Sequence, residues 1–377
     1  MDEPASTSAR RISASKSKHC LIIQQLPHPS ISSGHASQNN SEDRQMAPRI
    51  AVIGTGGTIS TPARHDLDAW EYGQFSKPME VDELLDRFAR VLVGHELLPV
   101  RFRAIDSVDM SPSVWLDLNR RITETVASDD SIVGVVVTHG TSTLEETAYF
   151  LHLALKVRVP VVVVGAQRPP HAVSSDTGIN LLNALRVAAA PAARDAGVLV
   201  VMNDEVHSAR DVVKSSNFGL QAFRSPDFGG LGGIDPDGNV AMYRRPLRRH
   251  APATEFDVGG LDELPMVEIV YSYAGASGRP VAALVEDGCR GIVFAGMPPG
   301  RASPAQSAEL ARAASDGVLV VQCSRAGSGR IVPRSGDRAM GFVAGDNLNP
   351  QKARLLAMLA LTRTNDRCAI ERMFQEY

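Results

Sequence analysis

The stretch SIVGVVVTHGTSTLEETAYFLHLALK (131–156) carries two hydrophobic periods in succession. Its first part, 131–140, is a β-branched run of the kind that is buried on both faces of a parallel sheet. From Leu144 onward, apolar residues recur at the spacing of one helix face, and Thr143 with Glu146 matches a capping box at the start of that helix. The stretch therefore predicts a strand followed by a helix.

The same alternation of strand and helix repeats on both sides of this stretch. Short apolar runs predict strands at 50–54, 159–166 and 197–204, with helical patterns between them, one of which runs from Val81 to Leu92. Such alternation forms right-handed βαβ units, which build a parallel or mixed sheet with helices on both faces. We predict a larger α/β domain whose ligands bind beyond the carboxyl ends of its strands.

A second, smaller α/β domain is predicted after a linker. The segment before it is rich in Gly, Pro and Arg, and DPDGN (235–239) is a turn signal between two short strands. New apolar runs begin at Met266, and Asn349-Pro350 caps a final helix. The predicted organisation is a disordered extension at 1–48, a catalytic domain at 49–247, a linker at 248–265 and an α/β domain at 266–377.

Composition excludes several classes of protein. The chain is 44% hydrophobic and 21% charged, as soluble globular proteins are, and its net charge of -3 offers no attraction to nucleic acid or to a membrane surface. No apolar stretch approaches the roughly 20 residues of a membrane-spanning helix. The four cysteines form no C-x-x-C pair, which predicts reduced structural thiols. The N-terminus lacks the apolar segment of a secretory signal, so we expect a cytoplasmic protein.

The loop Thr55-Gly56-Gly57-Thr58 directly follows the first predicted strand. Two glycines let the backbone turn sharply and approach a ligand, which leaves the Thr58 hydroxyl and nearby N–H groups exposed. A dinucleotide-binding loop or a simple turn would also use glycines here. The dinucleotide motif requires a further glycine where Ile59 stands, so a catalytic loop remains as an alternative to a simple turn.

A second polar loop, THGTST (138–143), ends the next strand and opens a helix. Hydroxyl and N–H groups at a helix N-terminus suit an anion or a developing oxyanion. Capping accounts for Thr143, whereas Thr141 has no such explanation. We interpret His139, at the end of the strand, as a structural hydrogen-bonding residue and not as a catalyst.

In order and spacing, these motifs resemble the bacterial-type L-asparaginase/glutaminase family over about residues 49–377. The segments that carry the resemblance are TGGTI, DMSPSVWLDL (109–118), THGTSTLEETAYFL, GAQRP (165–169), SSDTGINLLNA (174–184), VVMND, ARDVVKS (209–215) and LNPQKAR (348–354). The resemblance implies an amidohydrolase that acts on a small linear amide without a metal or organic cofactor. It also implies a homotetramer, a dimer of dimers, with sites completed between subunits.

The resemblance also assigns catalytic roles. Thr58 falls where the family has its acyl-accepting nucleophile, and Thr141 and Lys214 fall where a threonine and a lysine favour transfer of a hydroxyl proton. In the family, a tyrosine on a flap assists the nucleophile. Trp70 and Tyr72 both stand near that position, and Tyr72 is the tyrosine available there.

Further matching positions concern substrate binding. Ser107 matches a serine that contacts the α-carboxylate of the substrate. Gly57 and Gly140 belong to the two polar loops described above, which we expect to surround the substrate. We expect these three residues to form part of the substrate site.

The chain departs from the family at four positions. Ser142 stands in place of an aspartate that binds the substrate ammonium and belongs to the lysine cluster, and Val108 replaces a glutamine. Gly275 replaces an asparagine that comes from the neighbouring subunit. A glutamate, also from the neighbour, is missing from RIVPRSGDRAM (330–340), where Arg334 is the best match.

These four changes converge on recognition of the substrate α-ammonium. A hydrogen bond to a charged group contributes about 1.5–3 kcal/mol, so losing two carboxylate contacts weakens binding by roughly two or more orders of magnitude. An arginine would repel an ammonium and attract an anion. We therefore expect the substrate to be an amide without a free α-amino group. The rest of this substrate would carry a carboxylate or a neutral, bulkier group. An ordinary L-asparaginase/glutaminase and a catalytically weakened small-molecule sensor are the alternatives.

Overall fold

The computed structural model describes residues 48–377, so the predicted extension lies outside the described residues except for its last one, Pro48. The strands are Arg49–Gly56 (β1), Glu96–Ile105 (β2), Ile132–Thr138 (β3), Val161–Val164 (β4), Val198–Met202 (β5), Glu205–Ser208 (β6), Val213–Lys214 (β7), Phe223–Arg224 (β8), Gly232–Ile234 (β9), Val240–Met242 (β10), Val267–Tyr271 (β11), Gly291–Gly296 (β12), Leu319–Ser324 (β13) and Val343–Ala344 (β14). The α-helices are Tyr72–Phe75 (α1), Val81–Arg87 (α2), Pro112–Ser128 (α3), Leu144–Ala154 (α4), Thr177–Ala189 (α5), Arg279–Glu286 (α6), Pro304–Ser315 (α7), Ser335–Ala339 (α8), Pro350–Leu361 (α9) and Arg367–Glu376 (α10).

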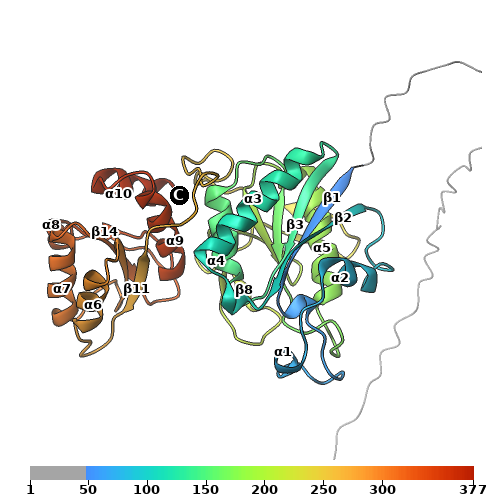
Figure 1. The fold of residues 1–377 in the computed structure, drawn as a ribbon, viewed down its shortest axis with the longest axis horizontal. Helices are drawn as coiled ribbons and strands as arrows, with labels where there is room; N and C mark the ends of the chain where they lie inside the picture. Colours follow the sequence, from blue (N-terminus) through green and yellow to red (C-terminus); the bar gives the residue numbers. More distant parts are fainter. Residues whose placement is uncertain (1–47) are drawn as a thin grey trace, which may run out of the picture. The chain divides into compact units, whose positions relative to one another are not determined.

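The larger sheet has eight strands in the order β10-β9-β6-β5-β4-β3-β1-β2. Strands β2, β1, β3, β4 and β5 run parallel, and β6, β9 and β10 add an antiparallel edge. Figure 1 shows α3 and α4 on one side of this sheet and α2 and α5 on the other. The predicted mixed sheet with helices on both faces is confirmed.

Strand β3 explains why both faces of the sheet are covered. Val135 and Val137 belong to one hydrophobic core, together with residues of α3 and α4, whereas Val136 belongs to the other, with residues of α2 and α5. All three side chains are fully buried. A strand with apolar residues on both faces is stable only between two layers of helices, as its β-branched sequence predicts.

The smaller sheet has four parallel strands in the order β11-β12-β13-β14. Helices α6 and α7 form a core on one face, and α9 packs on the other. Helix α9 also packs against α4 of the larger domain, so one hydrophobic core runs through both. The second, smaller α/β domain predicted from sequence is confirmed.

Two local predictions are wrong. Helix α2 ends at Arg87 and not at Leu92, because turns follow it. The capping box is absent: Thr143 is the N-cap residue of α4, but its side chain makes no capping hydrogen bond. Its hydroxyl donates instead to the carbonyl of Ser107, at 2.7 Å. A tertiary contact has displaced the local one.

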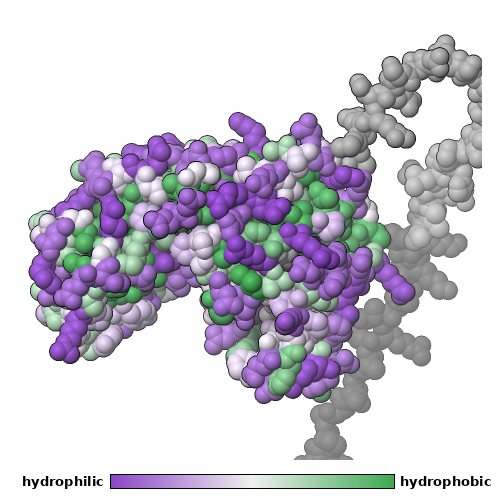
Figure 2. All heavy atoms as spheres, in the orientation of Figure 1, coloured by the Kyte–Doolittle hydropathy of each residue, from purple (hydrophilic) through white to green (hydrophobic). Residues whose placement is uncertain are grey.

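The surface is mostly hydrophilic on the face drawn in Figure 2, with hydrophobic side chains scattered over it. None of the helices in the part of the chain that the structure describes is long and apolar enough to cross a membrane. Cys289, Cys323 and Cys368 are free thiols, and Cys20 lies outside the described residues. Neighbouring apolar side chains bury the first two of these thiols.

Candidate active site

Three loops meet beyond the carboxyl ends of β2, β1 and β3. These strands are adjacent and parallel, with Gly56 paired to Ile105 and Gly54 paired to Thr138. A Cβ atom on Gly57 would lie 2.1 Å from the Cα atom of Gly140, so the two glycine loops touch backbone to backbone. Gly57 also has a φ of +83°, a conformation that L side chains rarely adopt. Glycine is therefore required for the loops to meet.

The loops line a cleft of about 370 Å³. Its walls come from the β1 and β3 loops, the segment around α1 and the loop after β2, through Gly57, Thr58, Thr61, Trp70, Tyr72, Gly73, Gln74, Ser76, Pro78, Asp106, Ser107, Gly140, Thr141 and Ser142. The volume lies within the usual range for small-molecule sites. The predicted residues Gly57, Thr58, Tyr72, Ser107, Gly140, Thr141 and Ser142 therefore share one cleft.

Thr58 is paired with Tyr72 across this cleft. The Thr58 Oγ1 atom lies 2.6 Å from the phenolic oxygen of Tyr72, which is the first residue of α1. Burial raises the pKa of the Tyr72 phenol, and the negative charges of Asp106 and Asp68 raise it further. Trp70 also lines the cleft, but it is 71% exposed and packs edge-on against Phe218. Of the two flap residues, Tyr72 is the one in contact with the Thr58 hydroxyl.

Lys214 reaches the cleft through Thr141. Its Nζ atom donates to Thr141 Oγ1 at 2.7 Å, from the short strand β7 that pairs with β8. Burial lowers the pKa of the Lys214 ammonium, and the carboxylate of Glu145 partly opposes this effect. A lysine held in this way is suited to exchanging a proton with the hydroxyl that it contacts.

The loop after β2 is hydrogen-bonded to the second polar loop, residues 138–143. Ser107 is buried, and its hydroxyl accepts the backbone N–H of Ser142 at 3.3 Å. Outside the helix and strand ladders, no hydrogen bond within residues 48–377 has the amide N–H of Thr58 or Thr141 as its donor. These N–H groups remain available to a ligand oxygen.

His139 is buried behind the second loop and does not line the cleft. Its Nδ1–H donates to the carbonyl of Gly140 at 2.7 Å. Burial lowers the pKa of the imidazole to about 4, so the ring is neutral at neutral pH. This contact agrees with a structural role.

Three predicted residues lie away from the cleft of this chain. Val108 follows Ser107, but its side chain is 67% exposed and outside the lining. Gly275 and Arg334 belong to the smaller domain and do not line the cleft of this chain, and their action on a neighbouring copy stays a prediction. Arg334 makes a two-point ion pair with Asp337, at 2.8 and 2.9 Å, which offsets its positive charge.

Sequence reasoning missed two acidic residues at the site. Among the described residues that line the cleft, Asp106 is the one with a formal charge. Glu145 lies behind the cleft, where its carboxylate accepts the backbone N–H of Lys214. The position of Asp106 beside Ser107 was a readable signal. Glu145 gave none, because its partner is 69 residues away.

Family models match nearly all of the described chain. The model "Asparaginase, N-terminal" matches residues 49–248, and the model "Glutaminase/Asparaginase C-terminal domain" matches residues 266–374. The chain belongs to the asparaginase family. Its members named as L-asparaginases and glutaminase-asparaginases are amidohydrolases, and this family member is an amidohydrolase too.

Relatives of this asparaginase-family chain extend over almost its whole length. It is 37% identical to L-asparaginase 2 of Bacillus subtilis (95% of this chain, 94% of that protein) and 42% identical to L-asparaginase 2 of Escherichia coli (88% and 93%). It is 38% identical to a glutaminase-asparaginase of Pseudomonas fluorescens (91% and 94%). The solved structure of a probable cytoplasmic L-asparaginase from Campylobacter jejuni matches with a TM-score of 0.82 and 40% identity, covering 88% of this chain and 100% of that one.

Proposed function

We propose that this chain hydrolyses a linear carboxamide to a carboxylate and ammonia, with the Thr58 hydroxyl as nucleophile. The observation that carries the proposal is the 2.6 Å contact between Thr58 Oγ1 and the Tyr72 phenol in a cleft that also contains Thr141. A free threonine hydroxyl is a poor nucleophile and needs a neighbouring group to take its proton. The nucleophile, the proton acceptors and the oxyanion donors are all protein groups, so the reaction needs no metal or organic cofactor.

In the first half-reaction, Thr58 Oγ1 attacks the carboxamide carbon and transfers its proton through the hydrogen-bonded groups of the cleft. Tyr72 stays a neutral phenol at neutral pH, because its pKa is raised, and so it orients Thr58 and relays a proton. The N–H groups of Thr58 and Thr141 face the oxyanion. The C–N bond then breaks, the leaving nitrogen takes a proton and departs as ammonia, and an acyl ester on Thr58 remains.

In the second half-reaction, water hydrolyses the ester. The Thr141–Lys214 pair supplies the base, since the lowered pKa of Lys214 increases the fraction of neutral amine. The water gives its proton to this pair, its oxygen adds to the ester carbon, and Thr58 leaves with a proton to regenerate the hydroxyl. The product is a carboxylate.

For the substrate, we propose an amide without a free α-ammonium group. Four family residues that are charged or polar are replaced in this chain. Ser142, Val108 and Gly275 stand where the family pattern has an aspartate, a glutamine and an asparagine, and Arg334 stands in place of a glutamate. The ion pair between Arg334 and Asp337 offsets the charge that would attract an anion. The charges therefore favour a substrate with a neutral group in place of the α-ammonium over a substrate with a carboxylate there.

L-Asparagine and L-glutamine are the second candidate substrates, and Asp106 favours them. Its carboxylate is the one formal charge among the described lining residues, and an α-ammonium would be attracted to it. The names of the relatives, L-asparaginase and glutaminase-asparaginase, point to the same substrates.

The experiment is an ammonia-release screen of the full-length protein and of Thr58→Ala. The substrates are Asn and Gln in both stereochemical forms, their N-acylated forms and simple dicarboxylic monoamides. We expect release from at least one amide, highest kcat/KM for one without a free amino group, and loss of release in Thr58→Ala. A micromolar KM for L-asparagine would reject the proposed substrate, and full activity of Thr58→Ala would reject the nucleophile. A sensor would bind an amide in both proteins without turnover.

We further propose that the protein is a cytoplasmic homotetramer in which Gly275 and Arg334 approach the cleft of a neighbouring subunit. The matching structure from Campylobacter jejuni is of a probable cytoplasmic L-asparaginase, whereas a relative from Haemophilus influenzae is a probable periplasmic L-asparaginase. Light scattering coupled to gel filtration gives the oligomeric state. A monomer with full activity contradicts the shared site.

A further inference from the structure

Glu145 lies behind the cleft and joins three parts of the fold. It occupies the first turn of α4 and is buried, and one of its carboxylate oxygens accepts the backbone N–H of Lys214 in β7 at 2.5 Å. The other oxygen accepts the side-chain amide of Asn349, the N-cap residue of α9 in the smaller domain, at 2.9 Å. Each oxygen of a buried carboxylate therefore has a different tertiary partner.

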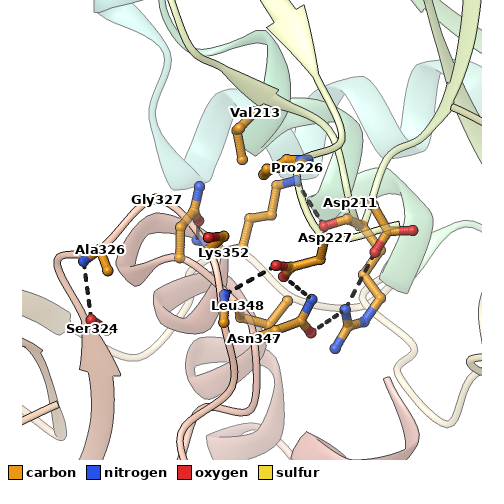
Figure 3. Close-up of a pocket in the computed structure, with 14 residues that line it drawn as sticks. Asp211, Val213, Pro226, Asp227, Ser324, Ala326, Gly327, Asn347, Leu348 and Lys352 are labelled. Atoms are coloured by element: carbon orange, nitrogen blue, oxygen red, sulfur yellow. Dashed lines mark hydrogen bonds and ion pairs between the residues drawn. The ribbon is translucent and has the colours of Figure 1, made fainter. Parts of the chain in front are cut away.

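The smaller domain also makes hydrogen bonds to the segment that directly precedes this strand. Lys352, in the first turn of α9, is fully buried, and its ammonium donates to the carbonyls of Arg210, at 2.8 Å, and Val212. These carbonyls precede Lys214 in the chain. Figure 3 shows Lys352 extended toward the segment of Asp211 and Val213, beside a small cavity of about 30 Å³.

Glu145 also contributes charge. Among residues 48–377, its carboxylate is the one charged group that opposes the effect of burial on the Lys214 ammonium, and it acts in the same direction on Lys352. The other charged groups near these lysines, on the loop before β7, on α4 and on α9, are Arg210, Asp211, Glu146 and Arg354. None of these makes a hydrogen bond to Lys214 within the described part of the chain.

We propose that Glu145 is a positioning residue that fixes the strand bearing Lys214 and supplies the carboxylate that balances the charge of its ammonium. The inference rests on the proposed role of Lys214 in proton transfer. It extends that role, because in this chain Ser142 stands where the family pattern has an aspartate beside the lysine cluster. The buried carboxylate of Glu145 does not line the cleft, so it acts on the lysine without contacting the substrate.

The test compares Glu145→Gln with Glu146→Gln. Glutamine keeps an oxygen for the Lys214 N–H and removes the charge, and its NH2 group also replaces the oxygen that accepts the Asn349 amide. Glu146 is the adjacent residue of the same helix turn, carries the same charge and has no hydrogen bond to Lys214, which makes it the matched control. Competitive acylation of the lysines across pH, read by peptide mass spectrometry, follows the titration of Lys214 without any need for a substrate.

In Glu145→Gln, we expect the titration midpoint of Lys214 to move to lower pH, and the acidic limb of kcat/KM to move with it. The maximal kcat falls about three- to tenfold, because a less basic amine is a weaker base, and KM is unchanged, because Glu145 does not line the cleft. Glu146→Gln should leave the midpoint of Lys214 in place. An unchanged midpoint in folded Glu145→Gln, or an equal shift in both variants, overturns the proposal.

A second variant tests the proposal independently, including the case in which Glu145→Gln does not fold. In Asn349→Ser, serine keeps the N-cap of α9 but is too short to hold Glu145. We expect a lower kcat with unchanged KM, and a retained fold with a lower Tm, because a buried oxygen of Glu145 loses its hydrogen bond. Unchanged kcat in this variant contradicts the positioning role. A wild-type protein that releases no ammonia from any amide contradicts the proposed function alone, because acylation still reports the effect of Glu145 on Lys214.

Discussion

The hydroxyl oxygen of Thr58 and the phenolic oxygen of Tyr72 lie 2.6 Å apart, although the two residues belong to different elements. Thr58 begins a short 3-10 helix after β1, and Tyr72 begins α1. At this distance, one hydroxyl donates to the other, so the orientation of Thr58 is fixed before a substrate binds. For the proposed nucleophile, this advance orientation reduces the entropy lost on reaching the geometry of attack.

Tyr72→Phe should therefore lower kcat about 10²- to 10³-fold, the range expected for loss of a proton relay. Trp70→Phe serves as the control, since Trp70 lines the same cleft without contacting Thr58. Ammonia release under saturating substrate measures both variants. A larger loss in Trp70→Phe than in Tyr72→Phe would assign the flap role to Trp70.

Lys214→Met should lower kcat by about 10²-fold or more, because Thr141 then has no partner to exchange a proton with. In the wild-type protein, activity should rise with pH as Lys214 loses its proton, with the midpoint below the ordinary lysine value of 10.5 because burial lowers its pKa. Lys156→Met is the control, since Lys156 is partly buried and bonded to Thr254 outside the cleft. A pH profile of kcat identical in Lys214→Met and wild type would remove Lys214 from the mechanism.

Ser142→Asp, combined with Val108→Gln, should raise kcat/KM for L-asparagine about tenfold or more, because a carboxylate regains a hydrogen bond to the α-ammonium. Activity on a neutral amide should stay the same or fall. Ser142→Asn, combined with the same Val108→Gln change, is the matched control, because asparagine has the same shape as aspartate and no charge. Equal gains from Asp and Asn would show that shape and not charge matters at this position.

Acid should destabilise the protein through His139. Burial lowers its pKa in the folded state to about 4 from 6.5, so between these values the unfolded chain binds more protons. The contribution of His139 to the free energy of unfolding is therefore full above pH 6.5 and is lost as the pH falls toward 4. In His139→Asn, which keeps a donor for the Gly140 carbonyl, urea unfolding should show a smaller decrease over this range. An equal decrease in both proteins would indicate that His139 is already charged when folded.

Some elements were predictable because their signal is local. The valines of β3 occupy both faces of the sheet, and the Asn349-Pro350 pair caps α9 as expected, with the Asn349 side chain accepting the N–H of Lys352 at 3.0 Å. Strand β2, which presents Ser107, was missed. Its alternation of apolar and charged residues from Val100 to Ala104 is the pattern of an edge strand, and it was a readable signal.

The sequence by itself determined the layered α/β fold, the family and the residue types at the ends of the central strands, because these depend on hydrophobic period and on short motifs. The tertiary structure decided the pairings: Tyr72 rather than Trp70 against Thr58, the bond from Thr143 to the Ser107 carbonyl in place of a capping bond, and Glu145 behind Lys214. These contacts join residues 14, 36 and 69 positions apart. Their geometry depends on how strands and helices pack, and no local pattern in the chain specifies it.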